Sequence, residues 1–197
     1  MLRISENRLQ EYEKKHTEQI RRTAAECTVL LKKDGMFPLE GNCNLALYGN
    51  GIRHTIKGGT GSGDVNVRAF SNIEEALISA GFHITSSEWL DGYDKVMYQA
   101  KKAFYNTLKE QAKAAGVPVT MLAVGKVVPE PEYELKVDVK ATTAIYCLSR
   151  NSGDAGDRVA EKGDIQLTET EIRDILEINE KYEKFMLVLN IGGMVDL

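Results

Sequence analysis

Short apolar segments alternate with amphipathic segments along most of the sequence, and this alternation constrains the fold more than any other feature. Apolar runs predict core strands at residues 44–48, 82–85, 143–148 and 185–190. The segments between them place apolar residues every three or four positions, as a helix does. Strands that alternate with helices and are apolar on both faces favour a parallel sheet covered by helices. The predicted fold class is therefore α/β, a three-layer α/β/α sandwich with a mostly parallel sheet.

Several helix ends carry capping signals. Ser71 with Glu74 forms a capping-box pattern, Gly81 stops the helix that follows, and Thr168 with Glu171 forms a second capping box. The longest predicted helix spans residues 90–115 and ends before Gly116. Residues 118–128 are apolar, but Pro129-Glu130-Pro131-Glu132 breaks the run, which predicts a loop or an edge strand.

The N-terminal part has a different character. From Ser5 to about Thr28 the sequence is charged, and its apolar residues recur at helical spacing. An apolar strap follows at residues 29–39. We therefore predict an N-terminal helix over residues 1–28, packed on or leading into a domain over residues 29–197.

Composition excludes several classes of partner. The 197 residues, 43% of them hydrophobic, can bury one core, and the net charge of -4 offers no basic surface for nucleic acid. The longest apolar runs are far shorter than the roughly 20 residues that cross a bilayer, so no membrane partner or signal peptide is expected. Three widely spaced cysteines fit neither a disulfide framework nor a metal site, which indicates a reducing cytoplasm.

Ligands of parallel α/β sheets gather at the carboxyl ends of the strands. In this sequence those ends lie at residues 48–66, at residues 149–158 and at Gly192-Gly193. We therefore expect a candidate site in these three regions.

A glycine-rich segment runs from Lys57 to Asp64 within the first region. Such a segment first suggests phosphate binding by backbone N–H groups. However, its lysine precedes the glycines, and His54 stands where a dinucleotide fingerprint has its third glycine. Nucleotide binding is the least favoured of the functions considered.

The second region, Ser149 to Arg158, follows a core strand and is dense in groups that bind sugars. Asp and Asn bond vicinal hydroxyls, Arg supplies a fork of donors, and a carboxyl group can transfer a proton. A solvated turn held by an internal Asp–Arg pair would explain the same residues. Composition alone favours the solvated turn, and sugar binding is the alternative.

Other reactive residues give weaker signals. The three histidines share no ligand spacing, so no metal is expected, and no cofactor is implied. Ser152 is not in a Gly-x-Ser-x-Gly elbow. Trp89 and Tyr93 could stack on a sugar ring, but packing in the protein is favoured for both.

Three segments resemble family 3 glycoside hydrolases of the β-glucosidase kind. The strap Val29-Leu30-Leu31-Lys32-Lys33-Asp34-Gly35-Met36-Phe37-Pro38-Leu39 is similar to the "VLLKNDGxLPL" strap that opens their α/β sandwich domain. Lys57 to Asn66 resembles the loop after that domain's first strand, as in members whose sandwich precedes the barrel, and Ser149 to Arg158 resembles "SRNSGEGADR". The resemblance covers about residues 18–197 and implies a fragment of the enzyme.

The resemblance implies a retaining β-glucosidase acting on a β-glucoside or oligosaccharide, with its nucleophile on a TIM barrel absent from this chain. Asp154 stands where the family has its acid/base glutamate, although its side chain is one methylene shorter and Ala-Gly follows instead of Gly-Ala. The fragment alone is expected to be inactive. The substrate-binding residues implied are Lys57, Gly58, Gly59, Thr60, Arg150, Asn151, Asp157 and Arg158.

Two further expectations follow from the resemblance. The sequence stops at Asp196-Leu197, where the family continues to another strand, so the sheet should be incomplete at its C-terminal end. A non-catalytic carbohydrate-binding or assembly module of the same fold is the alternative function. The change to Asp154 is the best support for that alternative.

Overall fold

The structure is a computed structural model that describes residues 8–32, 35–39, 41–59, 63, 65, 67–124, 126–152 and 158–197. The chain forms two compact units. One comprises Met1–Glu40 and Asn66–Ser71, and the other comprises Gly41–Val65 and Asn72–Leu197. The boundary predicted at residue 28 stays a prediction.

The first unit contains the predicted N-terminal helix, α1 (Glu11–Thr23), which continues into the short 3-10 helix η1 (Ala24–Cys27). Gln10 caps α1 through a reciprocal capping box with Glu13. Within this unit Arg68 pairs with Glu13. None of the residues of α1 is buried, and in the strap Leu31 is 92% exposed. This unit therefore supplies little of the chain's apolar core.

The second unit is built on a parallel four-stranded sheet in the order β2-β1-β3-β4. The strands are β1 (Asn44–Tyr48), β2 (His83–Ile84), β3 (Thr143–Arg150) and β4 (Lys184–Ile191). Every residue of β3 is buried, as a central strand of a covered sheet requires. All four strands were predicted from the sequence to within a few residues.

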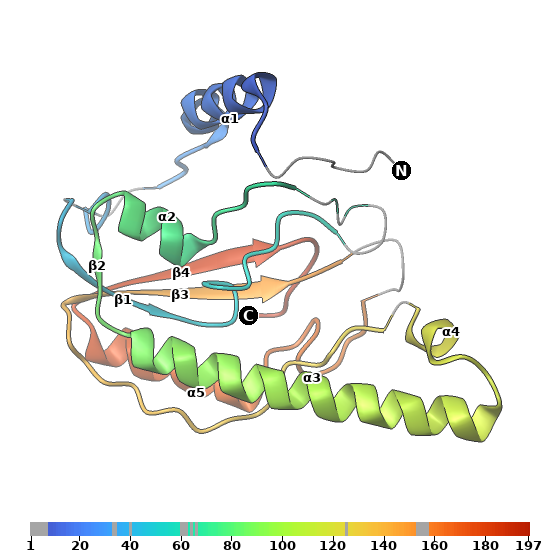
Figure 1. Cartoon of the computed structure of the whole chain (residues 1–197). Helices are drawn as coiled ribbons and strands as arrows, with labels where there is room; N and C mark the ends of the chain where they lie inside the picture. The colour runs from blue at the N-terminus through green and yellow to red at the C-terminus, as the bar shows by residue number, and fades with distance from the viewer. Residues whose placement is uncertain are drawn as a thin grey trace. The chain divides into compact units, whose positions relative to one another are not determined.

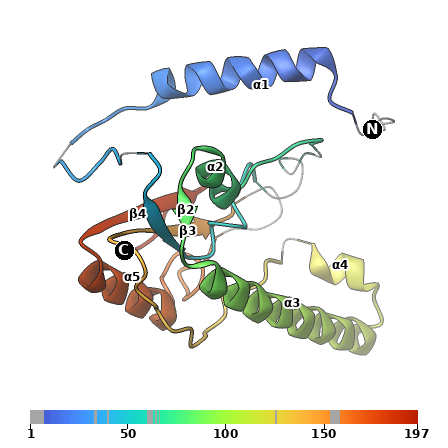
Figure 2. The same cartoon turned by 60° about the vertical axis from the view of Figure 1, so that its left-hand side comes forward.

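Helices cover both faces of this sheet (Figure 1). One face carries α2 (Ile73–Ser79), and the other carries α3 (Ser87–Ala115) and α5 (Glu169–Lys181), an arrangement that Figure 2 shows from a second direction. The predicted three-layer α/β/α sandwich with a parallel sheet is therefore confirmed.

An aromatic cluster fills the space between the sheet and the first turns of α3. The rings of Trp89 and Tyr93 stack 5.7 Å apart, and Tyr48 and Tyr133 meet Trp89 edge-on. Trp89 is 5% exposed and Tyr93 is 2% exposed. Both side chains therefore pack in the core, as the sequence favoured.

The predicted N-terminal cap of α5 is confirmed, whereas the cap of α2 lies one residue later than predicted. Thr168 accepts from the Glu171 amide, as predicted. The cap of α2, however, is Asn72 with Glu75, not Ser71 with Glu74. Asn and Ser are both good caps, so the two registers look alike in sequence. Glu74 instead bonds Arg53, a long-range contact that the local pattern does not contain.

The segment after α3 differs from the prediction. Gly116 ends α3 in a left-handed conformation, with φ of 67°, as a C-terminal glycine should. Pro118 then caps a short helix, α4 (Val119–Ala123), where a loop or edge strand was predicted. A proline suits the start of a helix as well as an edge strand, because the first N–H groups of a helix need no internal partner.

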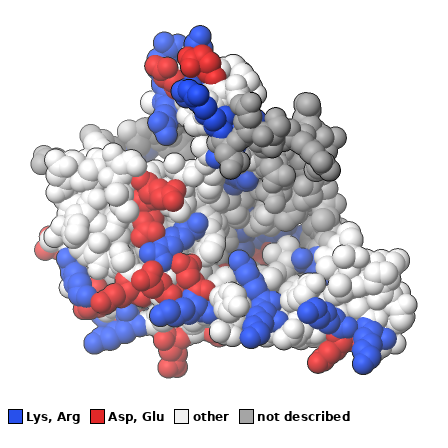
Figure 3. Space-filling view, viewed as in Figure 1, with Lys and Arg blue, Asp and Glu red and all other residues white. Residues whose placement is uncertain are grey.

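On the face shown in Figure 3, acidic and basic side chains lie interspersed and form no continuous basic patch. No described helix is long and apolar enough to cross a membrane. The three cysteines are free, with Cys27 exposed, Cys43 half-buried and Cys147 buried in β3.

Candidate functional site

The carboxyl end of β1 turns tightly against β3. The turn Gly49-Asn50-Gly51 lets the Gly51 amide donate to the Cys147 carbonyl over 2.9 Å. Gly49 has a φ of 89°, and a Cβ there would lie 2.4 Å from the Cys147 carbonyl oxygen. A side chain at Gly49 is therefore excluded, and the turn brings Asn50 beside the end of β3.

Asn50 binds the backbone of Ser149, the penultimate residue of β3. Its Oδ1 accepts from the Ser149 amide over 2.7 Å, and its Nδ2 donates to the Ser149 carbonyl over 3.2 Å. One side-chain amide thus holds both backbone groups of one residue. The ends of β1 and β3 are fixed to each other by this pair of bonds.

Asn190, near the end of β4, repeats the pattern on the segment that follows β1. Its Oδ1 accepts from the Ile56 amide over 2.6 Å, and its Nδ2 donates to the Ile56 carbonyl over 3.1 Å. The same Oδ1 accepts from the Ser149 hydroxyl over 2.9 Å. The Ser152 hydroxyl also donates to the Gly192 carbonyl over 2.7 Å. Described residues from all three predicted regions therefore lie together at the carboxyl edge of the sheet.

The first predicted segment is placed by these contacts. Lys57, Gly58 and Gly59 directly follow Ile56, and Thr60 lies outside the described residues. Lys57 donates to the Val65 carbonyl over 2.7 Å, across the glycine-rich loop. A Cβ at Gly58 would lie 2.6 Å from the Gly63 carbonyl oxygen, so this glycine permits the loop to close on itself.

Arg150 of the second segment is only 5% exposed, and its guanidinium is directed inward. It donates to the Glu171 carboxylate over 2.6 Å and to the carbonyls of Asp164 and Ser149 over 2.9 and 3.0 Å. Removal of one partner of such a pair leaves an uncompensated buried charge, at a cost of about 3–5 kcal/mol. Arg150 therefore anchors the end of β3 to α5. A substrate contact by Arg150 stays a prediction.

Asn151 and Arg158 have polar atoms that find no partner among the described residues. The Oδ1 atom of Asn151 and both terminal nitrogens of Arg158 are buried and unpaired, while the Nε of Arg158 bonds Asp164. Asp154 and Asp157 lie outside the described residues. Asp164 also accepts from the Val159 amide over 2.6 Å. Asp164, which the sequence reasoning missed, thus fixes the return from the second segment.

Glu130 is a second residue that the sequence reasoning missed, because it stands in a proline-rich segment without a motif. Its carboxylate accepts from the Tyr93 hydroxyl over 2.7 Å and from Asn50 Nδ2 over 2.9 Å. Burial raises the pKa of Glu130 to about 7, and the charge of Glu171 adds to this rise. A carboxyl group that titrates near neutrality therefore lies directly behind the Asn50 turn.

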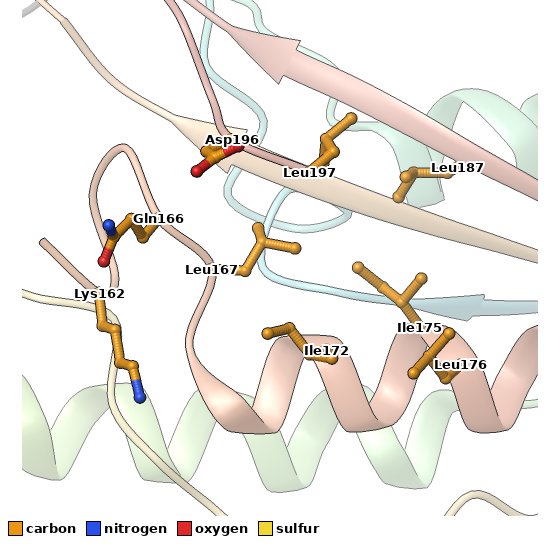
Figure 4. A pocket seen from close by; sticks show the side chains of 9 residues that line it. All are labelled: Lys162, Gln166, Leu167, Ile172, Ile175, Leu176, Leu187, Asp196 and Leu197. Atoms are coloured by element: carbon orange, nitrogen blue, oxygen red, sulfur yellow. The ribbon is translucent and has the colours of Figure 1, made fainter. Parts of the chain in front are cut away.

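A separate pocket, shown in Figure 4, has a different chemistry. It has a volume of about 480 Å³ and is mainly apolar, with Ile172, Ile175 and Leu176 of α5 facing Leu187 of β4. None of the predicted site residues lines it. We therefore place the candidate site at the strand ends, where the polar groups converge. Within the described ranges, no group of three or more His, Cys, Asp or Glu residues could hold a metal ion.

Two known proteins are similar in sequence to most of this chain. The sequence is 29% identical over 207 residues to β-glucosidase A of Butyrivibrio fibrisolvens, an alignment that covers 92% of this chain and 23% of the enzyme. It is 28% identical over 182 residues to a β-glucosidase of Ruminococcus albus, covering 88% of this chain and 17% of the enzyme. This chain is similar in sequence to part of each of these β-glucosidases.

Solved structures of β-glucosidases are similar in fold to most of this chain. The complex of β-glucosidase 3B from Thermotoga neapolitana with α-D-glucose superposes with a TM-score of 0.66 at 26% identity, over 95% of this chain and 26% of the enzyme. A β-glucosidase from Paenibacillus barengoltzii, at 21% identity and a TM-score of 0.61, shows the same fold. The predicted resemblance to the α/β sandwich of family 3 is confirmed. No family model matches the sequence.

The matches cover most of this chain but only a small part of each relative. The chain spans about a quarter or less of the length of these β-glucosidases, while the matches extend over most of the chain itself. The similarity therefore concerns one part of each of these longer enzymes.

Proposed function

We propose that this chain forms one wall of the active site of a retaining β-glucosidase, whose remaining wall is a TIM-barrel domain. The observation that carries this proposal is the link through Asn190 between Ile56, which precedes the first predicted segment, and Ser149, which begins the second, in a fold shared with β-glucosidases. In this proposal the intact protein hydrolyses terminal β-linked glucosyl or similar residues in a reducing cytoplasm.

Retention of configuration requires two carboxyl groups about 5 Å apart on opposite sides of the glycosidic bond. One attacks the anomeric carbon while the other protonates the leaving oxygen and later activates water. In our proposal Asp154 is the acid/base group of this chain, and the nucleophile belongs to the barrel. The chain alone then lacks half of the catalytic pair.

Asn151 and Arg158 are the described residues best suited to hold the sugar. A buried polar atom without a partner carries a desolvation penalty that a ligand hydroxyl can relieve. The unpaired Oδ1 of Asn151 can accept from a sugar hydroxyl, and the unpaired nitrogens of Arg158 can donate to one. The unpaired atoms support the sugar-binding interpretation of the second segment, whereas the ion pair of Arg158 with Asp164 is equally expected of a turn held by an Asp–Arg pair.

The division of labour is tested by a panel of nitrophenyl β-glycosides. We expect no hydrolysis by the 197-residue chain and hydrolysis by a longer protein that joins it to a barrel domain. Hydrolysis by the chain alone would refute the division.

The role of Asp154 is tested in the longer protein by Asp154→Asn. We expect a rate loss on the order of 10²–10⁴-fold, the usual contribution of general acid–base catalysis, with partial rescue by azide. Asp138→Asn is the matched control, because Asp138 is an exposed carboxylate in the segment before β3. An unchanged rate for Asp154→Asn would remove that residue from the mechanism.

The alternative is a carbohydrate-binding module without chemistry, which the shorter Asp154 side chain favours. A glucose titration of the chain, followed by NMR, separates the two functions when combined with the glycoside assay. Binding without hydrolysis in any longer form supports the module.

A further inference from the structure

The contact between Asn190 and Ile56 joins two residues 134 positions apart in the sequence. Ile56 belongs to no strand, yet both its backbone groups are bonded as they would be in a sheet, with the side-chain amide of Asn190 in place of a neighbouring strand. Both backbone groups of Ile56 are therefore held by a single side chain of β4.

The orientation of the Asn190 amide is fixed by chemistry. The Ile56 N–H can only donate and the Ile56 carbonyl can only accept, so Oδ1 must face the former and Nδ2 the latter. The Ser149 hydroxyl, a further donor to Oδ1, is consistent with this orientation. An ionised aspartate of the same size cannot donate and would face the Ile56 carbonyl with a negative charge.

Two segments with predicted functions begin at the residues that Asn190 holds. Ile56 directly precedes Lys57, and Ser149 directly precedes Arg150. Ser149 is held in turn at its backbone by Asn50. One side chain thus connects the glycine-rich loop to the segment that follows β3, through bonds of 2.6 to 3.1 Å.

We propose that Asn190 is a positioning residue that sets the register of Ile56–Gly59 against the end of β3. It acts through the Ile56 backbone and the Ser149 hydroxyl and does not itself contact substrate. The inference deepens the proposed function, since its consequence for sugar binding rests on that function, whereas the positioning of the loop can be measured without any sugar.

The first measurement needs no variant. In NMR spectra of the chain, a scalar coupling across the hydrogen bond should connect the Ile56 amide nitrogen to the side-chain carbonyl carbon of Asn190. Absence of this coupling, with both signals assigned and the fold intact, would overturn the inference.

The second measurement uses Asn190→Asp. At pH 7 the carboxylate still accepts from the Ile56 amide but cannot donate to the Ile56 carbonyl. Local opening should therefore be easier, and amide exchange over residues 56–59 should accelerate by about two- to tenfold relative to the unmodified chain, an effect the size of one lost hydrogen bond. Near pH 3, where most of an ordinary aspartate is protonated, the carboxyl regains a donor, so this ratio should shrink towards one. Asn106→Asp makes the same change at an exposed position of α3 and should leave residues 56–59 unchanged.

The pattern of exchange separates positioning from general stabilisation. Acceleration confined to residues 56–59, with recovery at low pH, supports the inference. Equal acceleration across β1 and β3 means that Asn190 only stabilises the fold, and it overturns the inference. A glucose titration of the same variants reports on the proposed function separately, because the exchange result stands whether or not glucose binds.

Discussion

At the scale of single residues, the structure places polar side chains where they satisfy backbone groups that no strand or helix reaches. Asn50 and Asn190 each bond both backbone groups of one distant residue. Glu130 extends this network inward to Tyr93. The polar edge of the sheet therefore depends on a few residues whose local sequence carries no motif.

Glu130 should make stability depend on pH. Its pKa is raised from 4.5 to about 7 in the folded chain, so the folded state binds the proton more tightly than the unfolded state. The free energy of unfolding should therefore fall as pH rises between these two values and level off above pH 7. Glu130→Gln should reduce this fall by on the order of 2 kcal/mol, as measured by urea unfolding at pH 5 and pH 8.

The uncharged variant can keep the local bonds, because a glutamine can accept from Asn50 and donate to the Tyr93 hydroxyl. Glu134→Gln is the control, since Glu134 is exposed in the same segment. Equal pH dependence of the Glu130 variant and the unmodified chain would contradict the assignment.

At the scale of elements, β1 is paired unevenly along its length. Strand β2 covers only Asn44 and Leu45, and beyond it the Ser86 hydroxyl bonds both the Leu47 amide, over 2.7 Å, and the Leu47 carbonyl, over 2.8 Å. Ser86 is 5% exposed and directly precedes α3. One hydroxyl therefore completes the short edge of the sheet and fixes the start of the longest helix.

Ser86→Ala should leave two buried backbone groups of β1 without partners. We expect the free energy of unfolding to decrease by about 1–3 kcal/mol, as measured by urea denaturation. Ser79→Ala is the matched control on the exposed end of α2, and it should stay within about 0.5 kcal/mol of the unmodified chain. A loss for Ser86→Ala no larger than for the control would show that Leu47 finds other partners.

The elements show how far the sequence could predict this structure. The strands, α3, α5 and the Thr168 cap follow from local periodicity and capping, and all were predicted. The α2 cap and α4 were wrong, because Asn72 competes with Ser71 as a cap and Pro118 suits more than one local structure. The bonds of Asn50, Asn190 and Glu130 span 37 to 134 positions, so no local pattern contains them. Their polar character was the one signal that could have singled them out.

At the scale of the whole molecule, the division into two units is the main feature. Of the residues that the structure describes, the second unit contains the four strands and every buried apolar side chain, whereas α1 and η1 contain no buried residue. The second unit therefore holds the interactions that stabilise the fold.

Removal of residues 1–40 should leave the second unit folded. Because no described residue of the removed segment is itself buried, we expect the thermal midpoint, followed by circular dichroism, to change by less than about 4 °C. A chain that ends at Leu167 is the control, since it lacks α5 and β4 and should not fold. Loss of cooperative unfolding in the 41–197 chain would show that the first unit is required.

The buried thiol of Cys147 lies against the turn at Gly49 and Gly51. Gly51 lies directly over Cys147, where a Cβ would come within 2.4 Å of the sulfur, and burial raises the pKa of this thiol to about 11. Alkylating reagents attack thiolates, so Cys147 should stay unlabelled while the exposed Cys27 reacts. The rate at which Cys147 is labelled then measures how often the central strand of the sheet becomes exposed to solvent.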